Sequence, residues 1–322
     1  RQIPGRGSEE QASQRIRDSR PVRVFFLSLP LLACLIFWGE GIAGEKVRVA
    51  TYNLRNYLVC DRIVAGKWRP NYPKPEKEKA ALRAIITKAN ADILALQELG
   101  DESFLRELWH DLNTTGGPKY QHAVWMHGAD PEEERHLAVL SRLPFVSVTR
   151  HTELEFNYFD SRESPDRGLL EVEFETNGVH WRLFNLHLKS KWTERKEDPE
   201  GAIRREKEAR TIRDYVRKTY PPETKPNYLI GGDFNDHKNM AALRRFLTVN
   251  GKTLSRIIPC SDSRGHRWTH HYAKQDSYSR IDFIVTSPTM SERFVPETGI
   301  VQDGPDASTA SDHRLVQADF SF

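Results

Sequence analysis

Six short polar segments follow or open apolar runs of this 322-residue chain, at points where buried strands are expected to end. They carry carboxamides, carboxylates and imidazoles, and they are Thr51-Tyr52-Asn53, Gln97-Glu98, Asn185-Leu186-His187, Gly232-Asp233-Phe234-Asn235, Arg280-Ile281-Asp282 and Ser311-Asp312-His313. One buried sheet can hold all six at a single rim. Carboxylate and amide oxygens suit a hard cation such as Mg²⁺, which also binds phosphate oxygens. The pattern therefore predicts a pocket for a cation and a phosphate ester.

Two of these segments indicate a specific chemical role most clearly. Glu98 closes the apolar run 93–96, where a carboxylate is costly unless a cation or a basic side chain compensates it. Asp233 and Asn235 follow two glycines that permit a tight turn, and they share one side of an extended segment. An acceptor and an amide so placed can orient a water against phosphorus, although an Asx-rich turn has the same composition.

Two histidines lie at other strand ends. His187 ends one predicted strand, and His313 directly precedes the last one, next to Asp312, which is a candidate to contact a metal or its waters. A histidine that acts on phosphate near neutral pH needs a carboxylate to fix its tautomer and raise its pKa. Asp282 and Glu134 are the candidate carboxylates. A single histidine is more often structural, so the hypothesis depends on all six segments occurring together.

Apolar spacing predicts the elements that position these segments. We expect helices over residues 75–88, 103–112, 201–220 and 239–250, the last closed by Gly251. Strands are expected over residues 45–54, 92–98, 121–127, 136–142, 168–175, 179–188, 227–232, 279–286 and 314–322. Antiparallel hairpins, such as the one at Asn177-Gly178, outnumber crossover units. Two packed sheets with helices outside, in one α/β domain over residues 45–322, are the predicted architecture.

The first 44 residues are expected to lie outside this domain. Basic residues precede an apolar run over 24–38, and small residues over 39–44 follow it, which is the order of a secretory signal. The run is short for a membrane span, and Pro30 interrupts it. The sequence therefore predicts a secreted or periplasmic protein. An uncleaved membrane anchor is the alternative, and a lipoprotein cleavage box at Leu31-Leu32-Ala33-Cys34 ranks third.

Charge and cysteine content set limits on partners. Residues 1–44 hold six Arg and four acidic residues, so the remaining chain has 42 basic and 41 acidic residues. The sequence pI of 8.7 therefore does not imply a polyanion partner, and any affinity for nucleic acid must come from local patches. Cys60 and Cys260 remain after the leader, and they are either a pair or two free thiols.

Taken together, the motifs resemble the endonuclease/exonuclease/phosphatase superfamily of pancreatic deoxyribonuclease and the abasic-site endonucleases. The resemblance runs from residue 47 to residue 320 in family order, and Asn53, Gln97-Glu98, Gly232-Asp233-Phe234-Asn235 and Ser311-Asp312-His313 carry it. It implies a four-layered α/β sandwich, with two mainly antiparallel sheets packed face to face and helices outside. It also implies attack of water on a phosphoester with the help of Mg²⁺, or of Mn²⁺ in its place.

The resemblance also implies roles for individual residues. It makes Glu98 the main metal ligand, with help from Asn53 and Asp312. The implied catalytic residues are His187, Asp233, Asn235, Asp282 and His313. Less specific matches make Arg167 a phosphate contact and Glu134 the support of His187, within the triple Glu132-Glu133-Glu134 that leaves the register open. Lys189 follows His187 closely, so its ammonium group is a second candidate for phosphate, alongside Lys191.

A nuclease is the favoured activity. Gly-Asp-Phe-Asn and Arg-Ile-Asp look more like the nuclease branches of the superfamily than its inositol-phosphatase branch. A phospholipid or small phosphoester substrate, as in the related sphingomyelinases, is the alternative, and a non-catalytic binding protein is the third hypothesis. The aromatic residues of 268–278 either stack on a base or pack within a hairpin. We expect a monomer with no obligate protein partner.

Overall fold

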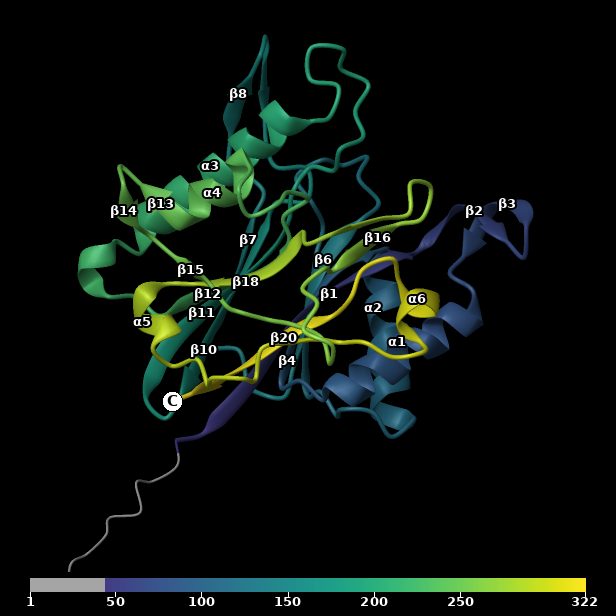
Figure 1. Cartoon of the computed structure of the whole chain (residues 1–322), viewed down its shortest axis with the longest axis horizontal. Helices are drawn as coiled ribbons and strands as arrows, with labels where there is room; N and C mark the ends of the chain where they lie inside the picture. Colours follow the sequence, from purple (N-terminus) through teal and green to yellow (C-terminus); the bar gives the residue numbers. More distant parts are fainter. Residues whose placement is uncertain (1–43) are drawn as a thin grey trace, which may run out of the picture. The chain divides into compact units, whose positions relative to one another are not determined.

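Two six-stranded sheets organise residues 44–322, the part of the chain that the computed structural model describes (Figure 1). The first sheet runs in the order β19 (Ile300–Val301), β20 (Val316–Ser321), β1 (Lys46–Tyr57), β4 (Ile93–Leu99), β6 (His136–Ser141) and β5 (His122–Met126). The second runs in the order β15 (Arg256–Ile257), β18 (Asp282–Thr286), β12 (Tyr228–Asp233), β11 (Val179–His187), β10 (Leu169–Thr176) and β7 (Ser147–His151). Each sheet contains a parallel pair, β1 with β4 and β11 with β12, among antiparallel neighbours.

The two sheets pack face to face over an apolar core built from alternating residues of their strands. Val316, Ala318 and Phe320 of β20 all lie in this core, as their period of two predicts. From the second sheet, Phe174 of β10 and Trp181 of β11 stack with their ring centroids 4.7 Å apart. Because one face of each strand is buried here, a register shift of one residue would expose the whole apolar set.

Helices cover the outer face of each sheet, on opposite sides of the domain (Figure 1). The first sheet is covered by α1 (Glu76–Ala89), α2 (Glu102–Thr114) and α6 (Ala307–Ala310), and the second by α3 (Ala202–Thr219) and α4 (Ala241–Leu247). Leu82, Ile85 and Ile86 form the buried stripe of α1, and each contributes about 1.5–3 kcal/mol by burial. The predicted four-layered α/β sandwich is confirmed.

Glu171 of β10 is the centre of a buried polar cluster beneath α3. It accepts hydrogen bonds from Tyr215, from Tyr220 and, at 2.9 Å, from Nε2 of His151. Burial alone would lower the pKa of His151, but Glu171 and Glu153 outweigh it and raise this pKa above its ordinary value. For Glu171 burial acts in the opposite direction and raises the pKa. The hydrogen bonds from His151, Tyr220 and Tyr215 outweigh burial and bring the pKa of Glu171 below its ordinary value. Glu171 and His151 thus each favour the charged form of the other within this buried cluster.

Two predicted elements are shorter than expected. The helix predicted over 239–250 ends at Leu247, because Asn250 and Gly251 take positive φ values in the turn between β13 (Thr248–Val249) and β14 (Lys252–Thr253). The strand predicted over 279–286 begins only at Asp282. Thr269 accepts hydrogen bonds from the backbone of 281 and 282, so the preceding β17 (Ser277–Ser279) pairs with β16 (His270–Tyr272) instead.

A hairpin of β2 (Val59–Val64) and β3 (Lys67–Pro73) extends from the end of β1. Ile63 and Trp68 lie directly opposite each other on it and are 70% and 62% exposed. Arg62 ties the hairpin to the body of the domain by donating to the Asn56 and Leu58 carbonyls at 3.1 and 2.7 Å. A two-stranded ribbon exposed on both faces is marginal by itself, so this anchoring matters for its order.

The remaining elements are short. They are β8 (Phe156–Tyr158), β9 (Ser161–Glu163), the 3₁₀ turn Pro222–Thr224 and α5 (Pro288–Ser291). The ends of the described region meet, because Phe322 N donates to the Glu45 carbonyl at 3.0 Å. Cys60 is half-buried and Cys260 buried, and both are free thiols. The predicted leader lies outside the described residues apart from Gly44, and no helix of residues 44–322 is long and apolar enough to span a membrane.

Candidate active site

The predicted polar residues come together where strands of both sheets end on the same side. Asn53 lies late in β1 and Glu98 late in β4, while His187 and Asp233 are the last residues of β11 and β12. Asp282 opens β18 directly opposite Asp233, because these two strands are antiparallel. Asp312 and His313 precede β20 on the same side of the first sheet. The fold therefore joins side chains that are up to 260 positions apart in the chain.

Asn53 links the two sheets where these residues converge, a group called the pocket from here on. Its Nδ2 donates to Glu98 Oε1 and to Asp233 Oδ2, both at 3.1 Å. Glu98 has a φ of +60° at an irregularity in the pairing of β4 with its neighbours, and its Oε2 accepts from the Asn56 backbone at 2.8 Å. A non-glycine residue in this conformation costs about 1 kcal/mol or more, so the surrounding contacts hold the carboxylate in place against strain.

Asp233 faces both histidines. Its Oδ2 lies 3.5 Å from His187 Nε2 and 3.8 Å from His313 Nε2, and all three residues are buried. Burial, reinforced by the nearby negative charges of Asp282 and Glu98, raises the pKa of Asp233 to about 7. Burial also lowers the pKa of His187 well below its ordinary value, with Arg167 acting in the same direction. The pocket thus concentrates groups whose protonation the protein has shifted.

Asp282 fixes the ring of His313. Both carboxylate oxygens lie near His313 Nδ1, at 2.9 and 3.0 Å, which leaves Nε2 directed toward Asp233. Burial alone would lower the pKa of His313, but Asp282 and Asp233 outweigh it and raise this pKa well above its ordinary value. The His313 backbone N–H also donates to Ser311 Oγ at 3.0 Å, so the segment before β20 is held at both main chain and side chain.

The turn after β12 places Asn235 beside Asp233. The Asn235 backbone N–H donates to Asp233 Oδ1 at 2.8 Å, and Asn235 Nδ2 donates to the Leu188 carbonyl at 2.9 Å. Gly232 has a φ of +151°, and a Cβ there would come within 2.0 Å of the Leu186 carbonyl oxygen. A larger residue would separate β11 from β12, so glycine is required for His187 and Asp233 to lie side by side.

A buried polar network behind the pocket fixes the spacing of the sheets. Asn185 of β11 donates to the Leu96 and Ala138 carbonyls of the first sheet, both at 3.0 Å, and accepts from Gln97 Nε2 at 2.7 Å. Sequence reasoning placed Gln97 and Asn185 at the rim but gave them no role. Their side-chain amides bridge the two sheets. The sequence signal for this role is a polar residue within an otherwise apolar strand, because a buried amide needs a hydrogen-bond partner.

The structure does not join Glu134, the predicted support of His187, to that histidine. Glu134 is exposed, and among residues 44–322 no hydrogen bond or ion pair joins it to His187. The half-buried neighbour is Glu133, whose carboxylate binds Arg167 at 2.5 Å and Arg135 at 3.3 Å. A turn over residues 130–133 precedes β6, so the alternation of a strand does not yet apply there, and neither Glu133 nor Glu134 is bonded to His187 in the described part of the chain.

Arg167 and Lys189 lie at the edge of the same pocket. Arg167 is buried, and its Nε and Nη1 atoms have no hydrogen-bond partner within the described part of the chain. Lys189 Nζ lies 3.7 Å from Asp166 Oδ2 and over the ring of the exposed Trp192. Both cations lower the pKa of His187, which places their charge near the pocket.

Sequence reasoning missed Arg135. Its Nε donates to Asn56 Oδ1 at 2.8 Å, and Asn56 in turn donates from its backbone to Glu98. Although burial alone would lower the pKa of Arg135, Glu98 and Glu133 outweigh it and raise this pKa. The signal in the sequence was a lone arginine directly before the buried strand β6, which gave no indication of its partner.

The comparisons with known proteins agree with this geometry. Residues 50–313 match the family described as the Endonuclease/Exonuclease/phosphatase family. The chain belongs to this family. Members of the endonuclease/exonuclease/phosphatase family are phosphoric ester hydrolases, so the protein is a phosphoesterase of this family. No curated protein matches the sequence.

Solved structures of the family share the fold at low sequence identity. A family member from Bacteroides vulgatus has a TM-score of 0.61 at 16% identity, over 86% of this chain and 99% of its own. The human nocturnin catalytic domain with bound sulfate has a TM-score of 0.58 at 16% identity, over 86% and 94%. A Staphylococcus aureus beta toxin mutant with bound magnesium ions has a TM-score of 0.59 at 16% identity, over 86% and 100%.

The family is metal-dependent, and the residues at the pocket fit a divalent cation. Glu98, Asp233, Asp282 and Asp312 are the carboxylates at these strand ends, and repulsion from Asp282 and Glu98 contributes to the raised pKa of Asp233. Asp233, Asp282 and His313 each offer a ligand atom within 4.8 Å of the other two. Asp233 and Asp282 are buried, and Glu98 and Asp312 are half-buried. Without a positive charge such a group of carboxylates is costly, so its composition favours a bound cation.

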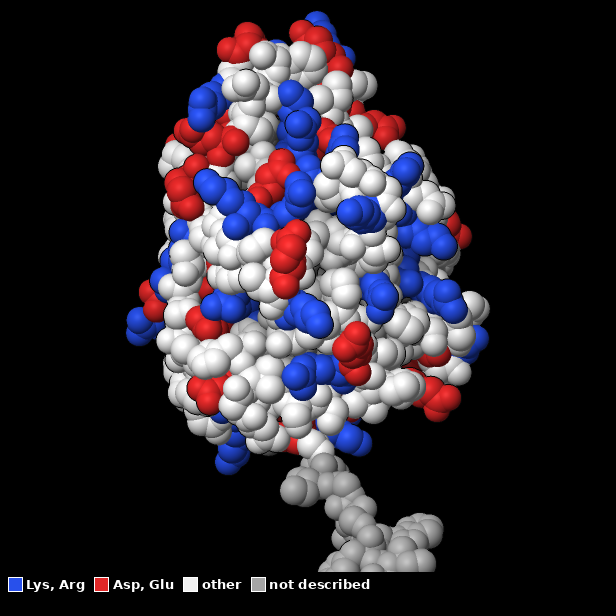
Figure 2. All heavy atoms as spheres, turned by 90° about the vertical axis from the view of Figure 1, so that its left-hand side faces the viewer, with Lys and Arg blue, Asp and Glu red and all other residues white. Residues whose placement is uncertain are grey.

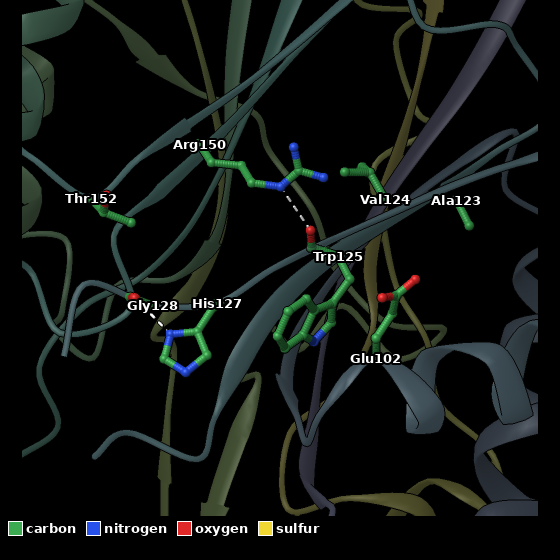
Figure 3. Close-up of a pocket in the computed structure, with 8 residues that line it drawn as sticks. All are labelled: Glu102, Ala123, Val124, Trp125, His127, Gly128, Arg150 and Thr152. Carbon is green, nitrogen blue, oxygen red and sulfur yellow. Dashed lines mark hydrogen bonds between the residues drawn. The ribbon is translucent and has the colours of Figure 1, made fainter. Parts of the chain in front are cut away.

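Two other surface features lie apart from this pocket. A depression of about 470 Å³ lies between β5 and β7, where Arg150 Nε donates to the Trp125 carbonyl, and none of the converging residues lines it (Figure 3).

On the side of the domain where β13, β14 and α5 lie, Figure 2 shows Lys and Arg interspersed with Asp and Glu. The arginines of α3 follow this pattern, since Arg204 pairs with Asp166 and Glu163. These features therefore provide no track of a single charge.

Proposed function

We propose that the protein is a Mg²⁺-dependent phosphodiesterase in which water attacks phosphorus in line, and that its substrate is a nucleic acid. The observation that carries this proposal is the approach of His187 and His313 to one carboxylate oxygen of Asp233, at 3.5 and 3.8 Å. Two imidazoles and a carboxylate in one buried pocket provide proton donors and an acceptor to the same reacting group.

In this proposal Asp233 and Asn235 position the attacking water. The Asn235 backbone N–H holds Asp233 Oδ1, so Oδ2 is the oxygen that accepts the proton of the water. The side-chain Nδ2 of Asn235 is held by the Leu188 carbonyl, which leaves its Oδ1 to accept a second hydrogen bond from the same water. Two acceptors at fixed positions restrict the water to one orientation, which lowers the entropy lost in reaching the transition state.

His313 and His187 act on the phosphoryl group. His313 is held by Asp282 through Nδ1, and its Nε2–H donates to a phosphoryl oxygen as negative charge develops. His187 presents its Nε2 from the neighbouring strand β11, while Arg167 and Lys189 add positive charge for the phosphate. Removal of one such donor typically costs about 10²-fold or more in rate.

Glu98, Asn53 and Asp312 would hold Mg²⁺, or Mn²⁺ in its place. When bound, the ion supplies Lewis-acid stabilisation of charge on the phosphate and on the leaving oxygen. The support in this chain is the position of the Glu98 carboxylate, which strained backbone and the Asn56 N–H hold beside Asn53.

A nucleic-acid substrate is supported by the rim of the pocket. Tyr272 and Tyr278 are exposed on the β16–β17 hairpin next to His313, where a base could stack. Hydrolysis of a phospholipid or small phosphoester is the second candidate. It is favoured by the β2–β3 hairpin, whose Ile63 and Trp68 form an exposed apolar pair suited to a lipid surface rather than to a phosphate backbone.

The test measures Mg²⁺-dependent turnover by the purified protein. Plasmid DNA, RNA, sphingomyelin and bis-p-nitrophenyl phosphate are offered separately to the wild-type protein and to His313→Ala. We expect cleavage of DNA or RNA that chelation of Mg²⁺ abolishes and that His313→Ala lowers by about 10²-fold or more. Turnover of lipid alone would support the second candidate, and no turnover of any ester by folded protein would refute both.

We further propose that residues 1–44 direct export and that the protein acts as a monomer outside the cytoplasm. The order of basic, apolar and small residues supports export. N-terminal sequencing of protein recovered from the periplasm or medium is expected to begin near residue 45, and light scattering is expected to give the mass of one chain. Retention of the apolar segment in a membrane fraction would instead support an anchor.

A further inference from the structure

His270 is held beside the catalytic pocket by the main chain of β16. The His271 N–H donates to the Asp312 carbonyl at 2.9 Å, and the Arg314 N–H donates to the Thr269 carbonyl at 2.7 Å. These two bonds pin the strand to the segment that carries His313 and form an isolated antiparallel bridge between residues 270 and 313. The backbone of residue 270 therefore has a fixed position next to residue 313.

Three metal-binding side chains converge at this point. His270, Asp312 and His313 each offer one ligand atom, and these atoms all lie within 4.8 Å of one another. The two imidazole rings are 4.6 Å apart between centroids. We propose that His270, Asp312 and His313 form a Zn²⁺ site that inhibits the enzyme when it is occupied.

The contacts around the two histidines leave one ring nitrogen of each free, whereas Asp312 Oδ2 lies 3.5 Å from Arg55 Nε, a cation that a bound metal would replace. Asp282 occupies Nδ1 of His313, so Nε2 is the nitrogen that can bind a metal. Nδ1 of His270 lies 3.4 Å from Ser279 Oγ, which again leaves Nε2 available. A carboxylate or hydroxyl behind a ligating histidine is the usual support in zinc sites, because it fixes the tautomer and the ring.

The ligand types favour zinc over magnesium. Mg²⁺ prefers oxygen ligands in an octahedron, whereas two imidazoles and one carboxylate suit Zn²⁺ in a tetrahedron. Three protein ligands leave the fourth position open to water or a small anion. Residues Asp233, Asp282 and His313 form a separate group of potential ligands that lacks His270, so the two groups share only His313.

Inhibition follows from that shared histidine and rests on the proposed function. A Zn²⁺ ion on Nε2 of His313 occupies the nitrogen that the proposed mechanism directs at the phosphoryl oxygen. Phosphodiester turnover then requires release of zinc. Zinc would also take Asp312, which the proposed function gives to Mg²⁺, so the two ions compete for that carboxylate while Glu98 and Asn53 remain with Mg²⁺. The site would make the activity of this protein sensitive to trace zinc at a constant concentration of Mg²⁺.

The decisive experiment measures Zn²⁺ binding by the full-length protein, independently of turnover. Equilibrium dialysis against Zn²⁺ in excess Mg²⁺ is followed by metal analysis for the wild type, His270→Gln and His271→Gln. His271 is the matched control, since it is the adjacent residue on β16 but bonds Asp276 at 2.9 Å and stacks on Tyr278. We expect His270→Gln to weaken zinc binding by about 100-fold or more, and His271→Gln to leave it unchanged.

A Co²⁺ spectrum and a second variant complete the test. Co²⁺ in the wild type is expected to give the intense visible bands of a tetrahedral site, and His270→Gln to lose them. If His270→Gln does not fold, Asp312→Asn must show the same loss of zinc affinity. Equal zinc binding by the wild type and a folded His270→Gln would overturn the proposal, because it would place the ion at the group without His270.

Turnover distinguishes the inhibitory role from binding alone. Micromolar Zn²⁺ should slow the wild type and His271→Gln, whereas His270→Gln should keep its rate and match the wild type without zinc. If zinc slows His270→Gln as much as it slows the wild type, the inhibitory role is wrong. If the wild type hydrolyses no ester, the proposed function fails while the binding measurements still decide whether the zinc site exists.

Discussion

Replacement of Asp282 by Asn tests the central contact of the proposed mechanism. Asp282 is buried, and both of its oxygens lie within 3.0 Å of His313 Nδ1. The substitution keeps the shape of the side chain and removes its charge. The pKa of His313, which the carboxylate raises, should then fall, and the imidazole should become a weaker donor at neutral pH.

The size of the effect follows from the kind of bond that is lost. A hydrogen bond to a charged group contributes about 1.5–3 kcal/mol, and each 1.4 kcal/mol corresponds to about a factor of ten. We therefore expect kcat to fall by about 10- to 150-fold, with a smaller change in KM. Steady-state hydrolysis of bis-p-nitrophenyl phosphate in saturating Mg²⁺ measures both constants.

A matched control and a double mutant isolate the role of the pair. Asp276→Asn removes the carboxylate from a similar 2.9 Å contact with His271, outside the pocket, and should leave kcat unchanged. Because Asp282 is argued to act through His313, adding Asp282→Asn to His313→Ala should have no further effect. A kcat within twofold of wild type in Asp282→Asn, or a large additional loss in the double mutant, would refute the reasoning.

Three further predictions concern stability, and urea unfolding measures each one. Asn185→Leu should lower the free energy of unfolding by about 3 kcal/mol or more, because three buried hydrogen bonds are lost, those to the Leu96 and Ala138 carbonyls and the one from Gln97 Nε2; a change below 1 kcal/mol would contradict this role. Gly232→Ala should prevent correct folding or cost about 4 kcal/mol or more, because its Cβ would collide with the Leu186 carbonyl; wild-type stability would contradict the described turn. The raised pKa of His151 means that its stabilising pair with Glu171 is complete below its ordinary value of 6.5 and is lost as pH rises through the folded-state pKa. The stability lost in His151→Gln should thus be larger at pH 6 than at pH 9, and a pH-independent difference would count against the pair.

The sequence predicted the parts of the fold that depend on local pattern. Buried strands such as β4 and β12 are short apolar runs with a polar residue at the end, so their position and their terminal Glu98 and Asp233 were both visible. The packing of two sheets against each other is not contained in local pattern. It was predicted from the resemblance of the ordered motifs to a known family. Helix α1 was placed within one residue at each end, since its stripe and its preceding Pro75 are strong signals.

What could not be predicted depends on turns and on contacts across the sheets. The choice between Glu133 and Glu134 is decided by the turns before β6, where consecutive carboxylates give no periodic signal. The helix α4 was overextended because Asn250-Gly251 also resembles a helix end. The Gln97–Asn185 bridge joins residues 88 positions apart, and only the packing of the two sheets brings them into contact.

The meeting of residues 45 and 322 has a practical consequence for handling the protein. Lys46 pairs with Ser321 at the end of the first sheet that is remote from Asn53 and His313. A short linker across this gap would close the polypeptide into a ring, and a new opening between Ala65 and Gly66, at the exposed tip of the β2–β3 hairpin, would leave every strand of both sheets uncut. A tether fixed at residue 45 or residue 322 would therefore leave the side of the first sheet that carries Asn53 and His313 free.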